Sequence, residues 1–435
     1  MKFRRPDIYW LVFCISALLF FSAGSRSALH DSRDFVPVYS GARCLFSGCN
    51  PYDTSQLEQQ YLQSGGRAGE LPAWDHQIPV YPPSALLVVS SLALLRYPAA
   101  CLLWLLLNGC MYVTAAGLIL SLCPRPQRWL ATILVSLILG TSRVLLLTGQ
   151  PATFAISLLI IGCYLFFRGR YLPLGAFVLM LSFAVKPQIG GMIVLYLFAR
   201  GIHRRYAAAA MAGALALLLS AGLMLSLHPG SAGWASDLGA NISASMKAGA
   251  INDPRPANVD ATADTNLQAL TSTFIANERE FNAAAYAVFL VLLAVLIMAV
   301  LRTTAGREMY FLSIGALSAL TPMPVYHRYY DARMLLITVP AVAIVYQKRR
   351  LLGAMMGAVT VLIAIPVQTR AQLFLLDHAM WQSVVQHKFL FILLLRQQNL
   401  ELLILFNLYM VAIFAIRFPG AAANREPSAQ STGGA

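Results

Sequence analysis

The sequence predicts an all-α protein that crosses a membrane many times. Of its 435 residues, 58% are hydrophobic and 11% are charged, whereas a soluble domain carries roughly 25% charged residues. Residues 97–124 and 206–236 contain no Asp, Glu, Lys or Arg, and a membrane-spanning helix needs about 20 apolar residues. These observations exclude a soluble enzyme and predict a polytopic membrane protein.

The chain carries a formal net charge of +14, which in a soluble protein would suggest a nucleic-acid partner. No basic stripe is interleaved with aromatic residues, however, so no nucleic-acid partner is expected. The basic residues collect in short clusters between apolar runs, which is typical of cytoplasmic loops. These clusters are MKFRR at the start, Arg168 with Arg170, Arg200 with Arg204 and Arg205, and residues 348–350.

The crossings are assigned in order from a cytoplasmic N-terminus. The first covers about residues 8–25 and opens a polar outer segment over about 26–80. Residues 83–95 are apolar but too short to cross, so they are expected to form an interfacial or re-entrant helix. The next crossings are expected at about 98–122, 129–148 and 151–167, at two short helices within 171–199, and at 206–227.

A second outer loop is expected over roughly 228–282, which is rich in Asn, Asp, Pro and Ser. Residues 1–416 are expected to form one integral membrane domain. Residues 417–435 are short and rich in Ala, Gly and Ser, which predicts a disordered cytoplasmic tail. The later crossings, at about 283–301, 308–322, 333–346, 351–366 and 398–416, bring the total to 12.

Under this topology, 14 of the 18 carboxylates lie on the outer side, so the function is expected there.

The basic start followed by an apolar run also fits a cleaved signal peptide, although Ser22-Ala23-Gly24 is a poor processing site. Cys44 and Cys49 face an oxidising compartment and could pair, and two free thiols are an equal alternative. No zinc or haem motif is present, so no metal is expected.

The first outer segment carries a candidate general base, Asp34. This residue follows a crossing and has apolar neighbours, so it should lie at or just above the membrane surface. A partly desolvated carboxylate is more basic and can accept a proton from a hydroxyl. The alternative is that Asp34 caps a helix over residues 37–46. The residues alone favour neither interpretation.

A second constellation lies in the outer turn from Tyr326 to Arg333. Its cations, His327 and Arg328, could neutralise a phosphate, and its tyrosines, with Tyr330 among them, could stack on a sugar. The alternative is an aromatic belt with a turn held by ion pairs through Asp331, as is usual at membrane edges. The residues alone favour this alternative.

Lys186 is the single charge between residues 171 and 199, at the tip of a predicted hairpin. A charge there needs a partner, and ionisable residues within membranes often have a function. A lipid phosphate would be a natural partner, and snorkelling to ordinary headgroups is the equal alternative.

Asn266 and Gln268 offer amides to sugar hydroxyls, but polar loop residues are common and this signal is weak alone.

Several blocks recur in an order that resembles a known family. They are DF…Y.GA…G.NPYD over 34–53, YPPSALLV…LALL over 81–95, Gly149-Gln150 before an apolar span, FAVKPQ leading to LYLFARGIHRR over 183–205, NLQAL over 266–270, and HRYYD before LLITVP. In these blocks the chain is similar to polytopic glycosyltransferases of the C superfamily. Within that superfamily it resembles family 87, which includes polyprenyl-phosphate-mannose-dependent mannosyltransferases.

The resemblance implies a membrane glycosyltransferase with its site on the outer face of the inner (cytoplasmic) membrane. The outer loops over about 26–97 and 228–282 would form the catalytic face. The donor would be a polyprenyl-phosphate sugar, mannose by family default, and the acceptor a glycolipid or a glycan. No cofactor is implied, and the other partners are membrane lipids. The turn reads HRYYD where many members carry a shorter aromatic-histidine motif, which leaves the sugar open.

The resemblance also assigns roles to residues. The family's catalytic base matches Asp34, with Asp31 as the competing assignment, and a functionally important histidine matches His327. The candidate substrate-binding residues are Asp31, Tyr39, Tyr81, Gln150, Lys186, Asn266, Gln268, His327, Arg328, Tyr330 and Asp331.

The chemistry is an inverting transfer in which Asp34 deprotonates an acceptor hydroxyl as it attacks the anomeric carbon. Polyprenyl phosphate then leaves, with Lys186, His327 and Arg328 as the cations around it. A secondary transporter or lipid flippase is the alternative class. Transporters usually place broken helices and charges near the bilayer midplane in two repeated halves, whereas these carboxylates lie in outer loops and the halves show no evident symmetry.

Overall fold

The computed structural model describes residues 5–28, 32–68, 78–303, 306–365 and 367–417. Within these ranges every regular element is a helix, and one isolated antiparallel bridge joins Asp264 to Arg328. The all-α class that the composition predicts is therefore confirmed for the part of the chain that the structure describes. Asp31 lies outside the described residues, as does nearly all of the predicted C-terminal tail.

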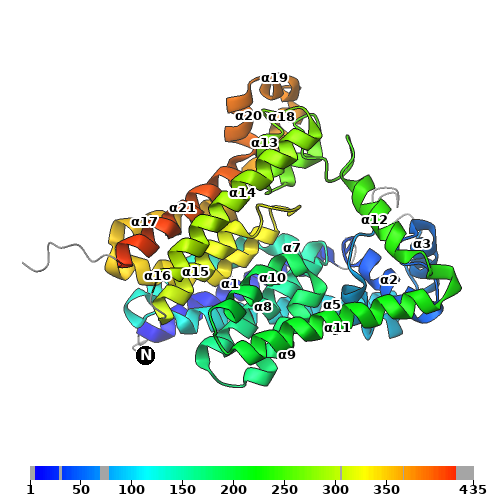
Figure 1. The fold of residues 1–435 in the computed structure, drawn as a ribbon, viewed down its shortest axis with the longest axis horizontal. Helices are drawn as coiled ribbons and strands as arrows, with labels where there is room; N and C mark the ends of the chain where they lie inside the picture. Colours follow the sequence, from blue (N-terminus) through cyan, green and yellow to red (C-terminus); the bar gives the residue numbers. More distant parts are fainter. Residues whose placement is uncertain (1–4, 29–31, 69–77, 304–305, 366, 418–435) are drawn as a thin grey trace, which may run out of the picture.

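The long apolar runs form the helices of a bundle (Figure 1). The first half contributes α1 (Arg5–Ala28), α5 (Tyr97–Leu122), α6 (Arg128–Thr141) with α7 (Arg143–Leu147), α8 (Pro151–Arg168), α9 (Leu172–Val185), α10 (Pro187–Ala199) and α11 (Arg204–Leu227). The second half contributes α14 (Glu278–Leu301), α15 (Arg307–Leu320), η6 (Asp331–Thr338) with α16 (Val339–Lys348), α17 (Arg350–Ala364) and α21 (Gln397–Arg417).

Shorter helices make up the connections. They are α2 (Val36–Ser47), α3 (Thr54–Gln63), α4 (Pro83–Val89), η2 (Leu92–Leu94), η3 (Arg125–Gln127), η4 (Pro229–Ser231), α12 (Trp234–Ser245), η5 (Val259–Ala263), α13 (Leu267–Thr271), α18 (Val367–Asp377), α19 (Trp381–Gln386) and α20 (Lys388–Leu395). The apolar stretch 83–95 forms only α4 and η2, which agrees with the prediction that it is too short to cross.

Six described helices are long and apolar enough to span a membrane, or seven if the bent pair of α17 and α18 counts as one span. The six are Tyr97–Leu122, Arg125–Leu147, Pro151–Arg168, Arg204–Leu227, Glu278–Leu301 and Gln397–Ile416. Three further apolar helices are shorter, at Ile8–Ser22, Leu172–Val185 and Pro187–Ala199. The chain is therefore a polytopic helical membrane protein.

Proline sets where two of these helices begin. Pro151 and Pro187 each stand at the first position of a helix, directly after Gln150 and Lys186. A residue before proline is pushed out of the helical region, so the chain breaks there. Lys186 accordingly has φ −145° and ψ 84°. Both polar side chains are therefore presented at a break between helices.

The first connection is more buried than a solvated interfacial segment would be. Phe35 stacks on Trp104 with ring centroids 4.9 Å apart, and Tyr39 packs edge-on against Tyr97 at 5.4 Å. The hydroxyl of Tyr39 donates to the carbonyl of Leu95 at 2.6 Å. α2 is thus an internal element of the fold, held by an aromatic cluster at the end of α5.

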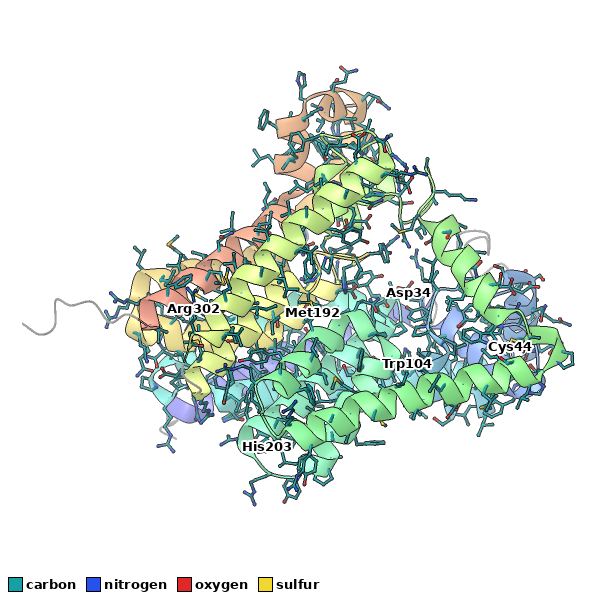
Figure 2. The ribbon with its side chains drawn as sticks, viewed as in Figure 1. Asp34, Cys44, Trp104, Met192, His203 and Arg302 are labelled. Atoms are coloured by element: carbon teal, nitrogen blue, oxygen red, sulfur yellow. A yellow bond between two sulfur atoms is a disulfide. The ribbon has the colours of Figure 1, made fainter. Side chains whose placement is uncertain are left out.

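The connections gather at two opposite ends of the bundle. α5 has 26 residues, so its ends lie about 39 Å apart. Figure 2 shows Asp34 and Cys44 toward one side of the molecule and His203 and Arg302 toward the other. We call these the Asp34 end and the opposite end. At the opposite end, the segment after α10 contacts the C-terminal end of α14. The guanidinium of Arg200 donates to the Val300 carbonyl at 3.2 Å.

The segment from 367 to 395 was not assigned any structure from the sequence. It forms α18, α19 and α20, which have their own small apolar core of Leu375, Trp381, Val384, Phe391 and Leu395. These helices lie beyond α13 and α14 in Figure 1. The guanidinium of Arg396, directly after α20, donates to the Pro254 carbonyl at 2.8 Å and to the Ala261 carbonyl. The three helices therefore support the loop between α12 and α13.

Candidate functional site

Asp34 is positioned by the turn between α7 and α8. Its backbone N–H donates to the Thr148 carbonyl at 2.9 Å. The next residue, Gly149, has φ +65°, and a Cβ on it would lie 3.0 Å from the Cβ of Phe35. The indole of Trp104 donates to the Gly149 carbonyl at 2.8 Å. The close approach of these two segments therefore requires a residue without a side chain at position 149.

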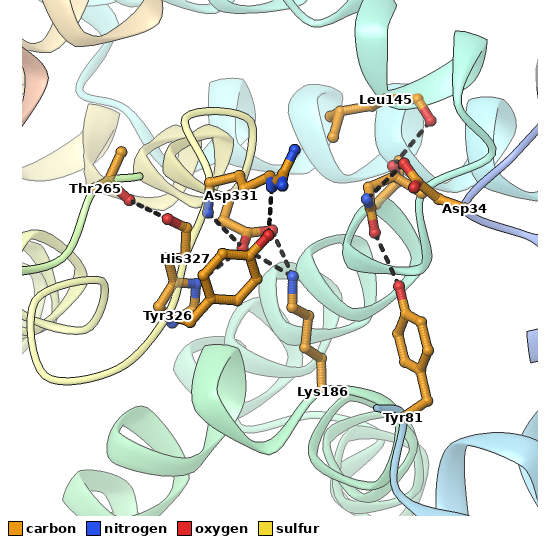
Figure 3. Close-up of polar contacts among 11 residues, drawn as sticks. Asp34, Tyr81, Leu145, Lys186, Thr265, Tyr326, His327 and Asp331 are labelled. Atoms are coloured by element: carbon orange, nitrogen blue, oxygen red, sulfur yellow. Dashed lines mark hydrogen bonds and ion pairs between the residues drawn. The ribbon is translucent and has the colours of Figure 1, made fainter. Parts of the chain in front are cut away.

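The carboxylate of Asp34 points to a side-chain amide. The Nε2 of Gln150 donates to the Oδ2 of Asp34 at 2.8 Å, and the hydroxyl of Tyr81 lies 3.3 Å from the Oε1 of Gln150. Figure 3 shows this row of contacts, with Asp34 and Tyr81 on its two sides. The helix-cap alternative for Asp34 is wrong, because α2 starts at Val36 and has no side-chain cap.

The electrostatic environment makes Asp34 a stronger base than an ordinary aspartate. Burial raises the pKa of its carboxyl, although a hydrogen bond from Thr148 and the charges of Arg328 and Lys186 act in the opposite sense. The side chain is nevertheless only partly buried. Asp34 is therefore a basic carboxylate that can still be reached from outside, with cations close enough to act on it.

A second cluster lies beside the first and joins two distant segments. The ammonium of Lys186 donates to both carboxylate oxygens of Asp331, at 2.7 and 2.8 Å. The Nδ1 of His327 lies 2.9 Å from the Oδ2 of Asp331. Figure 3 shows Lys186 and His327 meeting at this one carboxylate. Lys186 is 9% exposed, so the snorkelling alternative is wrong, and its partner in the structure is a protein carboxylate.

The protonation states in this cluster follow from its contacts. Burial would raise the pKa of Asp331, but the Lys186 ammonium and the His327 ring outweigh it and hold this pKa at about 2. Burial lowers the pKa of His327, although Asp331 acts in the opposite sense. A neutral His327 that donates from Nδ1 keeps an acceptor lone pair on Nε2. This Nε2 is buried and has no hydrogen-bond partner among the described residues.

Arg328 is the cation that an incoming anion could engage. Its guanidinium donates to the Tyr326 hydroxyl and, at 3.3 Å, to the Ile251 carbonyl. Among the described residues it donates to no carboxylate. Tyr330 lies next to the same cluster, with its ring centroid 5.9 Å from the ammonium of Lys186.

The loop before α13 holds the turn from 326 to 331 in place. The backbone N–H of Thr265 donates to the His327 carbonyl at 2.9 Å, and that of Tyr329 donates to the Ala263 carbonyl at 2.8 Å. This short pairing places Asp264 against Arg328. Through this pairing, residues 263–265 of the second outer loop contact the turn from 326 to 331.

Sequence reasoning missed Asp264 as a site residue. Its side chain is 1% exposed, and neither carboxylate oxygen has a hydrogen-bond partner among the described residues. Burial raises the pKa of Asp264 to about 7, although Arg328 and Arg396 act in the opposite sense. The sequence shows only one carboxylate among several in a polar loop, so no signal distinguished it.

Three predicted binding residues have structural contacts instead. Asn266 caps α13 by accepting from the Ala269 N–H at 2.8 Å, and the Nε2 of Gln268 donates to the Pro324 carbonyl at 2.9 Å. Tyr39 is fully buried in the aromatic cluster described above. The structure brings Asp34, Tyr81, Gln150, Lys186, His327, Arg328, Tyr330 and Asp331 to the Asp34 end. Asn266 and Gln268 form hydrogen bonds in the loop around α13, and the Oε1 of Gln268 is buried with no hydrogen-bond partner among the described residues.

One further sequence question is answered at this end. Cys44 and Cys49 form a disulfide. Within the described ranges, no group of three or more His, Cys, Asp or Glu side chains could hold a metal ion. Two cavities, of about 460 and 300 Å³, are lined neither by Asp34 nor by the cluster of Lys186, and the smaller one lies between α2, α3 and η2.

Comparison with known families bears on residues 80–325, which match the profile of glycosyltransferase family 87. The match covers more than half of the chain. The chain belongs to glycosyltransferase family 87. None of the curated proteins and none of the solved structures that were compared matches it. The protein is therefore a membrane glycosyltransferase by family and by its helical, membrane-spanning fold.

The family 87 match includes Tyr81, Gln150 and Lys186 but ends before His327 and begins after Asp34. The contacts described above connect the two groups: Gln150 holds Asp34, and Lys186 holds Asp331. Residues inside the matched region of this family 87 glycosyltransferase thus position side chains that lie outside it.

Proposed function

We propose that this glycosyltransferase transfers a sugar from a polyprenyl-phosphate donor to an acceptor hydroxyl, with inversion at the anomeric carbon and with Asp34 as the general base. The single observation that carries the proposal is the environment of Asp34. Its carboxylate is partly exposed, has a raised pKa, is oriented by Gln150 and feels the charges of Arg328 and Lys186. A base beside cations is what an attack on a sugar phosphate requires.

The reaction begins with a proton transfer to Asp34. Asp34 takes the proton of the acceptor hydroxyl as its oxygen bonds to the anomeric carbon. The bond between that carbon and the phosphate oxygen breaks at the same time, and the electron pair leaves with the polyprenyl phosphate. Gln150, itself in contact with Tyr81, holds the Asp34 carboxylate in one orientation. Fixing a base in this way lowers the entropy cost of the transfer.

The leaving phosphate is assigned to Arg328. Lys186 is already neutralised by Asp331 through two short contacts, whereas the guanidinium of Arg328 offers N–H groups that suit phosphate oxygens. Lys186 and Asp331 then serve mainly to hold the turn that carries Arg328 and His327. The Nε2 of His327 is left to accept a hydrogen bond from a sugar hydroxyl. This assignment needs no metal and no cofactor.

The sidedness is part of the proposal. We place the Asp34 end outside the inner (cytoplasmic) membrane, with 12 crossings, one membrane domain over residues 1–416 and both termini in the cytoplasm. The Cys44–Cys49 disulfide supports this, because disulfides persist in oxidising compartments. So do the basic segments around Arg200 and Lys348, which belong inside by the positive-inside rule. Mannose is proposed as the sugar by family default, and a glycolipid or glycan as the acceptor.

The test is a transfer assay with the purified protein in detergent and a radiolabelled polyprenyl-phosphate mannose. Asp34→Asn should lower kcat by about 100-fold or more, while Asp34→Glu should keep part of the activity. The wild-type rate should fall as the pH is lowered, because Asp34 becomes protonated. The midpoint of this fall should lie above the pKa of an ordinary aspartate, because burial raises the pKa of Asp34.

Size-exclusion profile and melting temperature serve as folding controls for both variants. Turnover of Asp34→Asn equal to that of the wild type would remove the base assignment. Transfer without any transmembrane gradient separates the enzyme from a transporter or flippase, which would move its lipid without forming a product.

A further inference from the structure

At the opposite end of the bundle, four arginines line a cavity of about 460 Å³. Arg125 lies in η3, between α5 and α6, and Arg128 starts α6. Arg168 lies in the last turn of α8, and Arg307 starts α15. The C-terminal part of α16 closes the cavity with Ile344 and Gln347. The positive charge is therefore concentrated by the fold, because these segments are far apart in the sequence.

The four charges of this cavity, which we call the arginine pocket, are not compensated. Glu308 is the one acidic residue that lines it, and its carboxylate pairs with Lys348. Arg168 lies over the ring of Tyr164 and Arg307 over that of Phe311, at 5.3 and 5.6 Å. Within the described ranges, none of the four guanidiniums forms an ion pair with a carboxylate.

One of the four arginines has a buried N–H group that lacks a hydrogen-bond acceptor. The Nε of Arg128 is buried and has no hydrogen-bond partner in the part of the chain that the structure describes. A buried N–H without a partner costs free energy that a bound acceptor would recover. Like charges gathered around one cavity also repel each other until an anion enters.

The lining indicates what kind of anion fits. Guanidinium groups recognise phosphate oxygens through paired N–H donors. Leu122, Phe311 and Ile344 add an apolar side to the pocket, at the boundary where the long apolar helices end. A phosphate attached to acyl chains would satisfy both parts, and basic pockets between membrane helices commonly bind anionic headgroups.

We propose that the arginine pocket binds a phosphate-bearing anion, supplied by the headgroup of an acidic phospholipid. It lies about 39 Å from the Asp34 end, the length of α5. The ligand is therefore distinct from the donor of the proposed reaction. Because it contacts α5, α6, α8, α15 and α16 together, its binding should stabilise the folded bundle by mass action.

The experiment compares the binding of phosphatidylglycerol and phosphatidylcholine to the purified chain by native mass spectrometry and by the shift in melting temperature. The test variant is Arg125→Gln/Arg128→Gln/Arg307→Gln. The matched control is Arg204→Gln/Arg205→Gln, which removes basic residues at the same end but outside the pocket. Phosphatidylglycerol should bind the test variant about tenfold or more weakly than the wild type, and the control as tightly as the wild type.

A second variant, which should bind phosphatidylglycerol more tightly, tests whether misfolding explains the loss of binding. Glu308→Gln removes the pocket's carboxylate and releases the ammonium of Lys348, so phosphatidylglycerol should bind it more tightly than the wild type. A misfolded variant would not gain affinity. Equal binding of the two lipids to the wild type, or equal losses in the test and control variants, would overturn the proposal.

A further arm separates the two sources of phosphate. Inorganic phosphate and glycerol phosphate are added in place of the lipid. Weak stabilisation by both, against strong stabilisation by phosphatidylglycerol, assigns the pocket to a lipid headgroup. Full stabilisation by inorganic phosphate, with no gain from the lipid, keeps the anion site but overturns the lipid as its source.

Discussion

Three carboxylates at the Asp34 end differ sharply in their environments. The carboxylate of Asp331 contacts Lys186, His327 and the backbone N–H of Arg328, and its pKa is about 2. That of Asp264 has no hydrogen-bond partner among the described residues, and its pKa is about 7. Asp34 has a raised pKa, although its carboxylate accepts hydrogen bonds from the Gln150 amide and from Thr148. Such divergence among nearby carboxyls is typical of catalytic sites, where each group has a different role.

The raised pKa of Asp264 predicts how the stability of the folded protein depends on pH. The folded state holds a proton on Asp264 up to about pH 7, whereas an unfolded aspartate loses it near pH 4. Between these values the folded state binds more protons, so stability should fall as the pH rises. Asp264→Asn removes this dependence and breaks no hydrogen bond that the carboxylate forms with the described residues.

The measurement is the melting temperature of wild type and Asp264→Asn in detergent from about pH 4 to pH 8. The variant should melt at a similar temperature at low pH and several degrees higher above pH 7. Asp260→Asn is the control, because Asp260 is exposed in the same loop. A difference that stays constant with pH would contradict the assignment.

At the scale of elements, the site depends on the ends of helices. The Gln150-Pro151 and Lys186-Pro187 breaks present a polar side chain at the start of α8 and α10. The turn before α8 also carries Thr148 and Gly149, which hold the backbone around Asp34. The position of the base is therefore decided by a helix connection more than 100 residues away in the chain.

Gly149→Ala should disturb this connection. A left-handed backbone disfavours any side chain by about 1–2 kcal/mol, and the added Cβ would press on Phe35 and Ser32 at 3.0 and 3.2 Å. We expect a lower melting temperature and reduced sugar transfer, both measured on purified protein. Gly140→Ala is the matched control, since a Cβ there meets nothing within 4 Å. Equal behaviour of the two variants would show that the turn does not position Asp34.

At the scale of the whole molecule, the connections alternate between two ends of the bundle. Contacts join Asp34 to Gln150, Lys186 to Asp331 and Thr265 to His327 at one end. Arg200 with Val300 and Lys348 with Glu308 lie at the other end. Segments that the positive-inside rule assigns to one side of the membrane are therefore the ones that meet in space.

Sidedness can be measured with single cysteines. Gln59→Cys in α3 and Arg205→Cys in α11 replace exposed side chains at the Asp34 end and the opposite end. A membrane-impermeant maleimide should label Gln59→Cys in intact cells and Arg205→Cys only after permeabilisation. The unsubstituted chain, with its five free cysteines, gives the background. Labelling of both variants from the same side would exclude the proposed topology.

The sequence alone predicted the helical class, most helix positions and the grouping of polar segments. It could do so because apolar runs, proline and charge act locally, within the length of one crossing. It also singled out Asp34, Lys186 and the turn from 326 to 331. It did not predict α18, α19 and α20, since short helices whose apolar sides face only one another leave no long apolar run.

What the sequence determined about this protein is therefore which segments form long apolar helices, and which polar residues stand at the ends of those helices. Tertiary structure alone decided which of these ends meet: the pairing of Lys186 with Asp331, the burial of Asp264 against Arg328, and the four arginines around one cavity. The physical reason is that partner choice depends on how the helices pack. A local pattern carries no information about which distant residue will supply the opposite charge.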